Sequence, residues 1–521
     1  MMLMLAAVAA VALSCQKVQT EAVSGNGGEP VYQFNFSVRG GGFITAGTKA
    51  DATVGWTTGE NVFVFFQPEG GNVLDKCLTL TYDGSKFKQS GSYIPYGRLG
   101  QKGRLSAVYV PYFSGRPAYS DGKWTIDGGD VYYSCANGVD YTVSDGAVTA
   151  TINMAIPDGY VQFAVDAATA GDNATLYCNM VDAWTCVTLG SDLTFSGVAV
   201  ESKMMTGHKD GEKVYFWGKK NDSAPADCNW ELTVGTDEFT KTVPSGSVAA
   251  NKAYNLSGFA SGPEYVVIGG LKWATMNIGA TTVAGSAATS YGNYYSWGST
   301  VVIYTGPTTL VPSNPFGEGI YHNTWNPSAG FCWNNAPYYV LSKGFTKYVP
   351  QDKAEDYGYE GFYDDKMTLD LADDVANKVL GGRWRTPTFE EYRDLYEACG
   401  GTGTSMVPKN ISSATISEGK VTSKGIYWCN SGQTRLPAIK VAGLLFSDGK
   451  GGNLFFPAAG KGFVTYTRPY YGGELVNCWT SSINPDAPGM AYSMGSFSDF
   501  LGIAGCDNRF DGNTVRAVKD L

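Results

Sequence analysis

Short runs of alternating apolar and polar residues, each followed by turn residues, recur along the first half of the chain. Residues 31–38 (VYQFNFSV) and 78–82 (LTLTY) are examples. Successive side chains of a β-strand point to opposite faces, so this alternation is typical of half-buried strands. The 67 glycines fit the same reading, because glycine supplies the backbone freedom that tight turns require. At 521 residues the chain has room for about three domains. We therefore expect a folded, mainly β protein.

The net charge and the small number of histidines argue against several classes of function for this chain. The formal net charge is −10 and no basic run offsets it, so a phosphate backbone would be repelled. Nucleic acid is therefore not expected as a partner. The two histidines, His208 and His322, leave little material for histidine-dependent catalysis or for zinc binding.

The predicted strands form two sets, which we interpret as two β sandwiches over residues 31–145 and 146–258. Strands in the first set are expected at 31–38, 61–66, 78–82 and 105–110. Those in the second set are expected at 147–154, 160–165, 174–177, 193–200, 213–217, 230–234 and 253–257.

Three motifs in these sets resemble those of fimbrillin-like surface proteins. They are residues 56–65 (WTTGENVFVF), 109–112 (YVPY) and 250–256 (ANKAYNL, with Asn251 where the family has glycine). The resemblance implies two transthyretin-like sandwiches, as in lipoprotein-derived pilus subunits. Pilins of this type are cut after an arginine in the first strand, and Arg39 holds that place. A plain turn arginine is the alternative reading of Arg39.

A third domain is expected over residues 259–521, after the loop-like segment 258–264 (GFASGPE). Its landmark blocks are 272–280 (KWATMNIGA), 291–298 (YGNYYSWG), 382–388 (GRWRTPT), 456–460 (FPAAG), 479–482 (WTSS) and 515–518 (VRAV). These resemble the Fibrobacter succinogenes major paralogous domain family, and imply an α+β fold of the C-type-lectin-like and sulfatase-modifying-factor kind. Thr388 predicts the start of a helix over 389–398, a second helix is expected over 370–379, and residues 305–364 read as an insertion.

The residues before Cys15 predict export and anchoring. Residues 1–13 are apolar, about as long as a signal-peptide core and too short to span a bilayer. Ala12, Leu13 and Ser14 before Cys15 resemble a bacterial lipobox, although the leucine is one position late. The resemblance implies removal of residues 1–14, lipidation of Cys15, a tether over 15–30 and an outer-membrane lipoprotein that meets the membrane only through its lipid. A plain secretory signal is the alternative.

Two kinds of chemistry follow from the second resemblance. Oxidases of the sulfatase-modifying-factor group, which generate formylglycine, use paired cysteines, and Cys478 and Cys506 are the candidates by position. A disulfide or two unreactive thiols is the favoured alternative, so we expect no enzyme.

Sugar-binding C-type lectins use calcium, and four oxygen-bearing side chains have a similar spacing here: Asn484, Asp486, Asp507 and Asn508. An ordinary Asn-Pro-Asp turn is the default reading, so no cofactor is assigned beyond a candidate calcium ion.

Aromatic residues crowd two loop-like segments, the insertion and residues 466–471 (YTRPYY). Exposed aromatic rings are favoured at binding surfaces because each covers a large area with few rotatable bonds. The predicted ligand-binding residues are Trp325, Trp333, Tyr338, Tyr339, Tyr470 and Tyr471.

These expectations combine into a cell-surface lipoprotein of adhesin or pilus-accessory type, with a lectin-like domain that binds glycan or a surface protein. The alternatives are a sulfatase-modifying or glycan-processing enzyme and a structural pilus subunit whose partners are other subunits.

Overall fold

The computed structural model describes most of the chain. The residues outside the description are 1–14, 20–31, 41–57, 86, 91–93, 112, 128–132, 172, 201–203, 222–227, 244–247, 303, 306–308, 311–330 and 463–468. The chain divides into two compact units, one of residues 1–239 with 243–260 and one of residues 240–242 with 261–521. No helix in the described part is long and apolar enough to cross a membrane.

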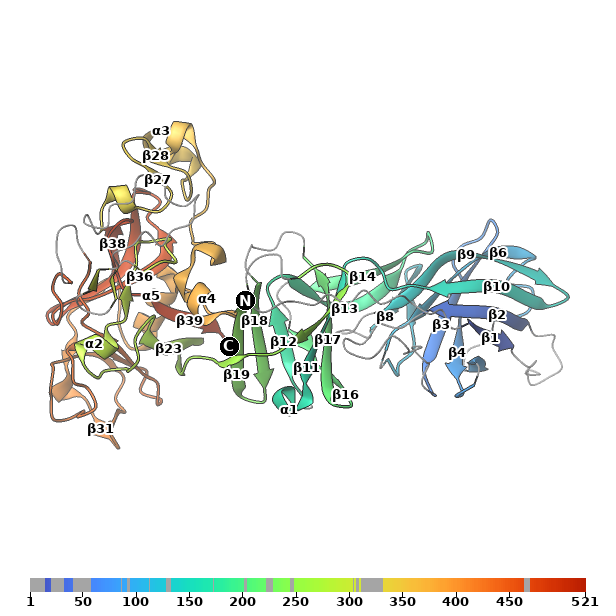
Figure 1. Cartoon of the computed structure of the whole chain (residues 1–521), viewed down its shortest axis with the longest axis horizontal. Helices are drawn as coiled ribbons and strands as arrows, with labels where there is room; N and C mark the ends of the chain where they lie inside the picture. Colours follow the sequence, from blue (N-terminus) through green and yellow to red (C-terminus); the bar gives the residue numbers. More distant parts are fainter. Residues whose placement is uncertain are drawn as a thin grey trace. The chain divides into compact units, whose positions relative to one another are not determined.

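Unit 1 is built from β-sheets, as the alternating runs predict (Figure 1). Its first sheet has eight strands in the order β1-β2-β10-β9-β6-β3-β4-β5. Their bounds are β1 (Cys15–Gln19), β2 (Gln33–Gly40), β3 (Asn61–Pro68), β4 (Cys77–Tyr82), β5 (Phe87–Ser90), β6 (Lys102–Tyr109), β9 (Ser134–Ser144) and β10 (Ala147–Met154).

The second sheet of unit 1 follows the order β20-β11-β17-β13-β8-β7, with β14 on β13 and β16 on β17, and a third includes β15-β12-β18-β19. The bounds are β7 (Ala118–Ser120), β8 (Lys123–Ile126), β11 (Tyr160–Asp166), α1 (Ala167–Ala170), β12 (Thr175–Cys178), β13 (Val181–Leu189), β14 (Phe195–Val200), β15 (Met205–Thr206), β16 (His208–Asp210), β17 (Lys213–Lys220), β18 (Cys228–Val234), β19 (Asp237–Val243) and β20 (Lys252–Leu256). The short strand β21 (Ala260–Ser261) lies at the boundary of the two units.

The strand pairing differs from the predicted division at residue 145. Asp145 and Gly146 both have positive φ, 49° and 76°, which is the two-residue turn that joins adjacent antiparallel strands. β9 and β10 therefore stay together, and β10 joins the first sheet, where it also runs parallel to β2. In return β8, from the predicted first set, pairs with β13 in the second sheet. The beginning of the predicted tether also differs, since Cys15–Gln19 form β1, with Cys15 opposite Arg39 on β2.

Two of the fimbrillin-like motifs meet in unit 1. The hydroxyl of Tyr109 donates a hydrogen bond to the carboxylate of Glu60. In the third motif, Asn251 has a φ of 58°, the left-handed conformation that favours glycine and that asparagine tolerates better than most residues. Trp56 and Tyr112 lie outside the described residues.

Unit 2 combines small sheets with short helices around three clusters of buried apolar side chains. The principal sheets are β22-β23-β39, β29-β38-β37-β36 and β30-β33-β34-β35. Their bounds are β22 (Tyr265–Ile268), β23 (Leu271–Asn277), β29 (Ser405–Met406), β30 (Lys409–Asn410), β33 (Gly425–Cys429), β34 (Gly443–Ser447), β35 (Asn453–Pro457), β36 (Val476–Ile483), β37 (Met490–Phe497), β38 (Phe500–Asn508) and β39 (Arg516–Asp520).

The remaining elements of unit 2 are short. They are α2 (Ala287–Ser290), β24 (Asn293–Tyr294), β25 (Tyr304–Thr305), β26 (Thr309–Leu310), η2 (Trp333–Asn335), β27 (Tyr339–Val340), β28 (Gly344–Phe345), η3 (Gln351–Lys353), α3 (Ala354–Tyr357), η4 (Tyr359–Gly361), η5 (Leu371–Asp373), α4 (Val375–Leu380), α5 (Phe389–Ala398), η6 (Ile411–Ser413), β31 (Ile416–Ser417) and β32 (Lys420–Val421). Within this unit β27, β28 and α3, all from the predicted insertion, project together (Figure 1).

The predicted helix over 389–398 is confirmed. Thr388 accepts a hydrogen bond from the backbone of Glu391, whose carboxylate accepts one from the backbone of Thr388 in return. The predicted helix over 370–379 is wrong at its start. Asp374 caps a shorter helix, α4, and the preceding residues form the single turn η5.

The landmark blocks of the third domain converge on its interior. The indole of Trp297 donates to the carbonyl of Thr480, and that of Trp479 donates to the carbonyl of Tyr295. Arg516, from the VRAV block, is fully buried, and its guanidinium donates to backbone carbonyls of Ala274, Thr275 and Phe455. These blocks therefore act as a structural frame.

Candidate functional site

Aromatic side chains gather on one face of the β37–β38 hairpin. Phe497 and Phe500 are opposite each other where the hairpin turns, and the ring of Tyr471 contacts that of Phe497, with 5.4 Å between centroids. The ring of Tyr470 lies against that of Tyr471 in a tilted arrangement, with 3.9 Å between centroids, and the two hydroxyls are hydrogen bonded at 2.9 Å. We call Tyr470, Tyr471, Phe497 and Phe500 the aromatic platform.

The platform is open to solvent. Phe500 is 52% exposed and Tyr471 is 43% exposed. Val407, which is 65% exposed, directly follows Met406, the partner of Leu501 on the neighbouring strand. Monomeric proteins seldom expose contiguous apolar patches without a function, and such patches commonly mark binding sites.

Local backbone features hold the rings in place. Gly502 lies beneath the ring of Phe500, whose edge would be only 3.0 Å from an added Cβ. Tyr471 has a φ of 57°, a left-handed conformation that costs a bulky residue on the order of 1–2 kcal/mol. Strain of this kind persists where the surrounding structure enforces it and is concentrated at functional sites.

A polar network occupies the same face of the sheet, beside the rings. Phe500 and Asp507 share this face because β38 contains a bulge: Ser493 pairs with Gly505, and Gly495, two residues on, pairs with Gly502. The carboxylate of Asp507 accepts hydrogen bonds from the four side chains Lys461, Asn477, Ser493 and Asn513, at 2.7–3.0 Å. Burial raises the pKa of Asp507, but these partners outweigh it and the net pKa is lowered.

The candidate calcium ligands do not converge. Asn484 contacts the thiol of Cys506 and accepts the backbone hydrogen bond of Asp486, as an ordinary turn does. Asp507, the next residue after Cys506 on β38, points to the opposite face and is neutralised by Lys461. Within the described part of the chain, no group of three or more His, Cys, Asp or Glu side chains could hold a metal ion. Asn484 and Asp507 therefore lie on opposite faces of the sheet, and the structure does not bring these two predicted ligands together.

The candidate catalytic cysteines are also apart. Cys478 lies on β36 and Cys506 on β38, with β37 between them. Burial raises the pKa of both thiols, which keeps them protonated and weakly nucleophilic. Cys478 and Cys506 are both free thiols, not joined in a disulfide.

The predicted contact residues of the insertion take part in its internal packing. Trp333 lies against Tyr339 and Phe510, with centroid distances of 4.7 and 4.6 Å. The hydroxyl of Tyr338 donates to Asp373, which also accepts from Tyr348 and Lys347. Trp325 lies outside the described residues.

A buried arginine ties the insertion to the sheet. The guanidinium of Arg509 is 4.0 Å from the ring of Phe345 and donates to the carbonyl of Lys347 at 3.2 Å. Burial lowers the pKa of Arg509 to about 9. Since neither Arg509 nor Asp373 was singled out in the sequence, this anchoring could not be foreseen.

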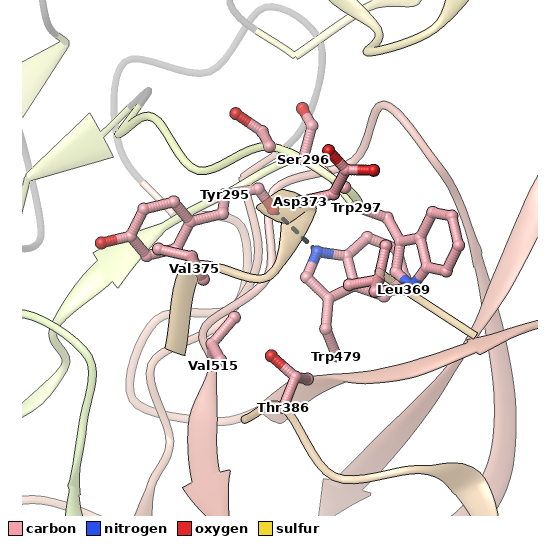
Figure 2. A pocket seen from close by; sticks show the side chains of 11 residues that line it. Tyr295, Ser296, Trp297, Leu369, Asp373, Val375, Thr386, Trp479 and Val515 are labelled. Carbon is pink, nitrogen blue, oxygen red and sulfur yellow. Dashed lines mark hydrogen bonds between the residues drawn. The ribbon is translucent and has the colours of Figure 1, made fainter. Parts of the chain in front are cut away.

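A small cavity in unit 2 is lined by residues that include Trp297 and Trp479 (Figure 2). Asp373 and Leu369 also line it, and the dashed line in Figure 2 is the hydrogen bond from Trp479 to Tyr295. Its volume is about 10 Å³, which is room for about one water molecule. An organic ligand would not fit, so the aromatic platform is the better candidate site.

No protein-family model matches the chain, and no curated protein matches it. The chain is similar to a putative cell adhesion protein from Bacteroides uniformis, at 15% identity and a TM-score of 0.26, over 40% of this chain and 91% of that one. It is also similar to a putative cell adhesion protein from Bacteroides ovatus (12% identity, TM-score 0.24, 48% and 90% of the two chains). A fimbrial protein from the same species aligns over 94% of this chain and 99% of its own, at 11% identity and a TM-score of 0.24.

Proposed function

We propose that this chain is a non-catalytic, cell-surface binding protein of adhesin or pilus-accessory type, and that unit 2 binds glycan or protein through the aromatic platform. The observation that carries the proposal is the combination of open rings and enforced geometry. Tyr471 and Phe500 are about half exposed, yet one is held in a strained backbone and the other is seated over a glycine. A fold has no need to hold exposed rings in this way for its own stability.

The chemistry of the platform suits contact rather than turnover. Aromatic faces bury large areas at little cost in side-chain entropy, and the paired tyrosine hydroxyls can accept and donate hydrogen bonds at the rim. The protonated, separated thiols of Cys478 and Cys506 do not supply a nucleophile. We also propose that unit 2 has a C-type-lectin-like fold.

Surface location is proposed from the sequence around Cys15. The apolar run before it is consistent with export, and a lipid on Cys15 would anchor the chain to the outer membrane. Processing at Arg39 and assembly into a pilus stay predictions.

The test measures binding of the purified chain to a glycan array and to immobilised mucin. Tyr471→Ala and Phe500→Ala should each weaken any binding about tenfold or more, as truncation of a central aromatic contact does. Tyr363→Ala is the matched control, because Tyr363 is 48% exposed but lies in the insertion. Full binding by both platform variants, or equal loss in the control, would contradict the assignment.

A further inference from the structure

The segment that carries Tyr470 and Tyr471 is fixed at its base by Lys461. Lys461 and Tyr470 exchange two backbone hydrogen bonds, at 3.0 and 2.7 Å. The neighbouring Gly462 exchanges another pair with Gly512, and the ring of Phe331 lies over both glycines. The position of Tyr470 therefore depends on where residues 461 and 462 are held.

The side chain of Lys461 points into a pair of carboxylates. Its ammonium is 2.7 Å from Asp507 and 3.7 Å from Asp511. Burial lowers the pKa of Lys461, but the two acids outweigh it and the net pKa is raised, so the side chain stays charged. One ammonium thus connects the platform segment to both ends of the turn that follows β38.

Of the three charged side chains Lys461, Asp507 and Asp511, which we call the charged cluster, Asp511 has the least complete hydrogen bonding. Its side chain is 2% exposed, its Oδ2 accepts the backbone hydrogen bond of Asn508, and its Oδ1 has no hydrogen-bond partner in the described structure. Lys461 and Asp507 are the charged groups that face it. A buried carboxylate with an unpaired oxygen is costly when ionised and far less so when protonated.

We propose that Lys461 is the positioning residue of the aromatic platform, and that proton binding by Asp511 regulates how firmly it holds the segment of Tyr470 and Tyr471. The consequence for ligand binding rests on the proposed function, whereas the structural part does not.

The direction of the pH effect follows from burial. Burial raises the pKa of Asp511 from 3.8 to about 6, and Lys461 only partly opposes it. A carboxyl whose pKa is raised in the folded state stabilises that state below its unfolded pKa, and the stabilisation is lost as the pH rises through the folded value. The contacts of Lys461 and Asp511 that hold the segment of Tyr470 and Tyr471 should therefore be more stable at pH 5 than at pH 7.5.

The test is amide hydrogen exchange of the full chain, followed by mass spectrometry and corrected for intrinsic rates. At pH 7, Lys461→Met should speed exchange at Tyr470 by roughly 10- to 100-fold. Lys461→Arg should restore most of the protection, because it keeps the charge. The matched control is Lys440→Met, which removes an exposed lysine of the same unit and should change nothing at Tyr470.

The pH series separates a positioning role from a merely structural one. Exchange at Gly512 should accelerate by about tenfold between pH 5 and 7.5, because a carboxyl with a pKa of about 6 loses most of its bound proton over that range. Asp511→Asn should abolish that pH dependence. Unchanged exchange at Tyr470 in Lys461→Met, or the same pH profile in Asp511→Asn, would overturn the proposal.

Binding measurements distinguish this proposal from the preceding one. Suppose that Lys461→Met speeds exchange at Tyr470 as expected, while Tyr471→Ala leaves glycan and mucin binding intact. The positioning role of Lys461 is then supported and the proposed binding surface is contradicted. If Tyr471→Ala weakens binding but Lys461→Met leaves exchange unchanged, the binding surface stands and the positioning role falls.

Discussion

The ring of Tyr471 lies edge-on to that of Phe497, with an angle of 85° between the ring planes. Tyr471 precedes β36 and Phe497 ends β37, so the contact joins two separate segments, and Tyr471 makes it with a φ of 57°. At a residue with a strained backbone, the usual order of stability of alanine and glycine variants should be reversed.

At Tyr471 we expect Gly to be more stable than Ala. Both substitutions remove the same ring contacts, but glycine adopts a positive φ without the steric penalty, worth about 1 kcal/mol. At Tyr470, whose φ is not positive, Ala should be more stable than Gly. Urea unfolding of the four variants measures both differences, and the same order at the two positions would contradict the strain at Tyr471.

Trp333→Ala should destabilise unit 2 by roughly 2–4 kcal/mol, because its indole fills the space among Tyr339, Phe345 and Phe510. Tyr471→Ala should cost no more than about 1 kcal/mol, since that ring is largely at the surface. Thermal unfolding checks the contrast. If Trp333→Ala left the stability unchanged and weakened ligand binding, Trp333 would be a ligand-contact residue and not a packing residue.

Asp373→Asn should cost about 2–4 kcal/mol, because the carboxylate accepts from two tyrosine hydroxyls and a lysine at once. The matched control is Asp356→Asn in α3, where the side chain is exposed and the change should stay within about 0.5 kcal/mol. Chemical unfolding curves compare the two. Equal stability of both variants would show that the insertion does not depend on this anchor.

Cys15→Ala tests the anchor. If a lipid on Cys15 holds the chain at the membrane, the variant should appear in the soluble fraction and should incorporate no labelled fatty acid. Serine at the same position should behave identically, since it also lacks the thiol. Retention of either variant in the membrane fraction would count against lipidation.

Much of the fold was predictable because its signals are local. The capping pair of Thr388 and Glu391 marks α5 within four residues, and alternation marks most strands of unit 1. The membership of β10 was missed although its signal was present, in the Asp145-Gly146 turn. A two-residue hairpin keeps its strands in one sheet, so no domain boundary can fall there.

The candidate site was only half predictable. Aromatic crowding pointed to Tyr470 and Tyr471, but Phe497 and Phe500 lie in another segment, where two aromatic residues flank a two-residue turn. The ion pair of Lys461 and Asp507 joins residues far apart in the sequence, and no local pattern announces it. The spacing of Asn484 and Asp486 from Asp507 and Asn508 indicated only a candidate calcium site, with an ordinary turn as the default reading. A strand alternates its side chains between faces, and spacing alone does not tell which face each takes.

The parallel pairing of β2 with β10 has a consequence for how the protein is made. Gln33 leaves the ribosome long before Ala147, its partner in the first sheet. During that interval one side of β2 lacks its native neighbour, and an unpaired strand edge is a template for association with other chains. Long-range pairing of this kind also slows folding. The emerging chain therefore carries an open strand until β10 is synthesised, and this segment is where a chaperone would be of most use.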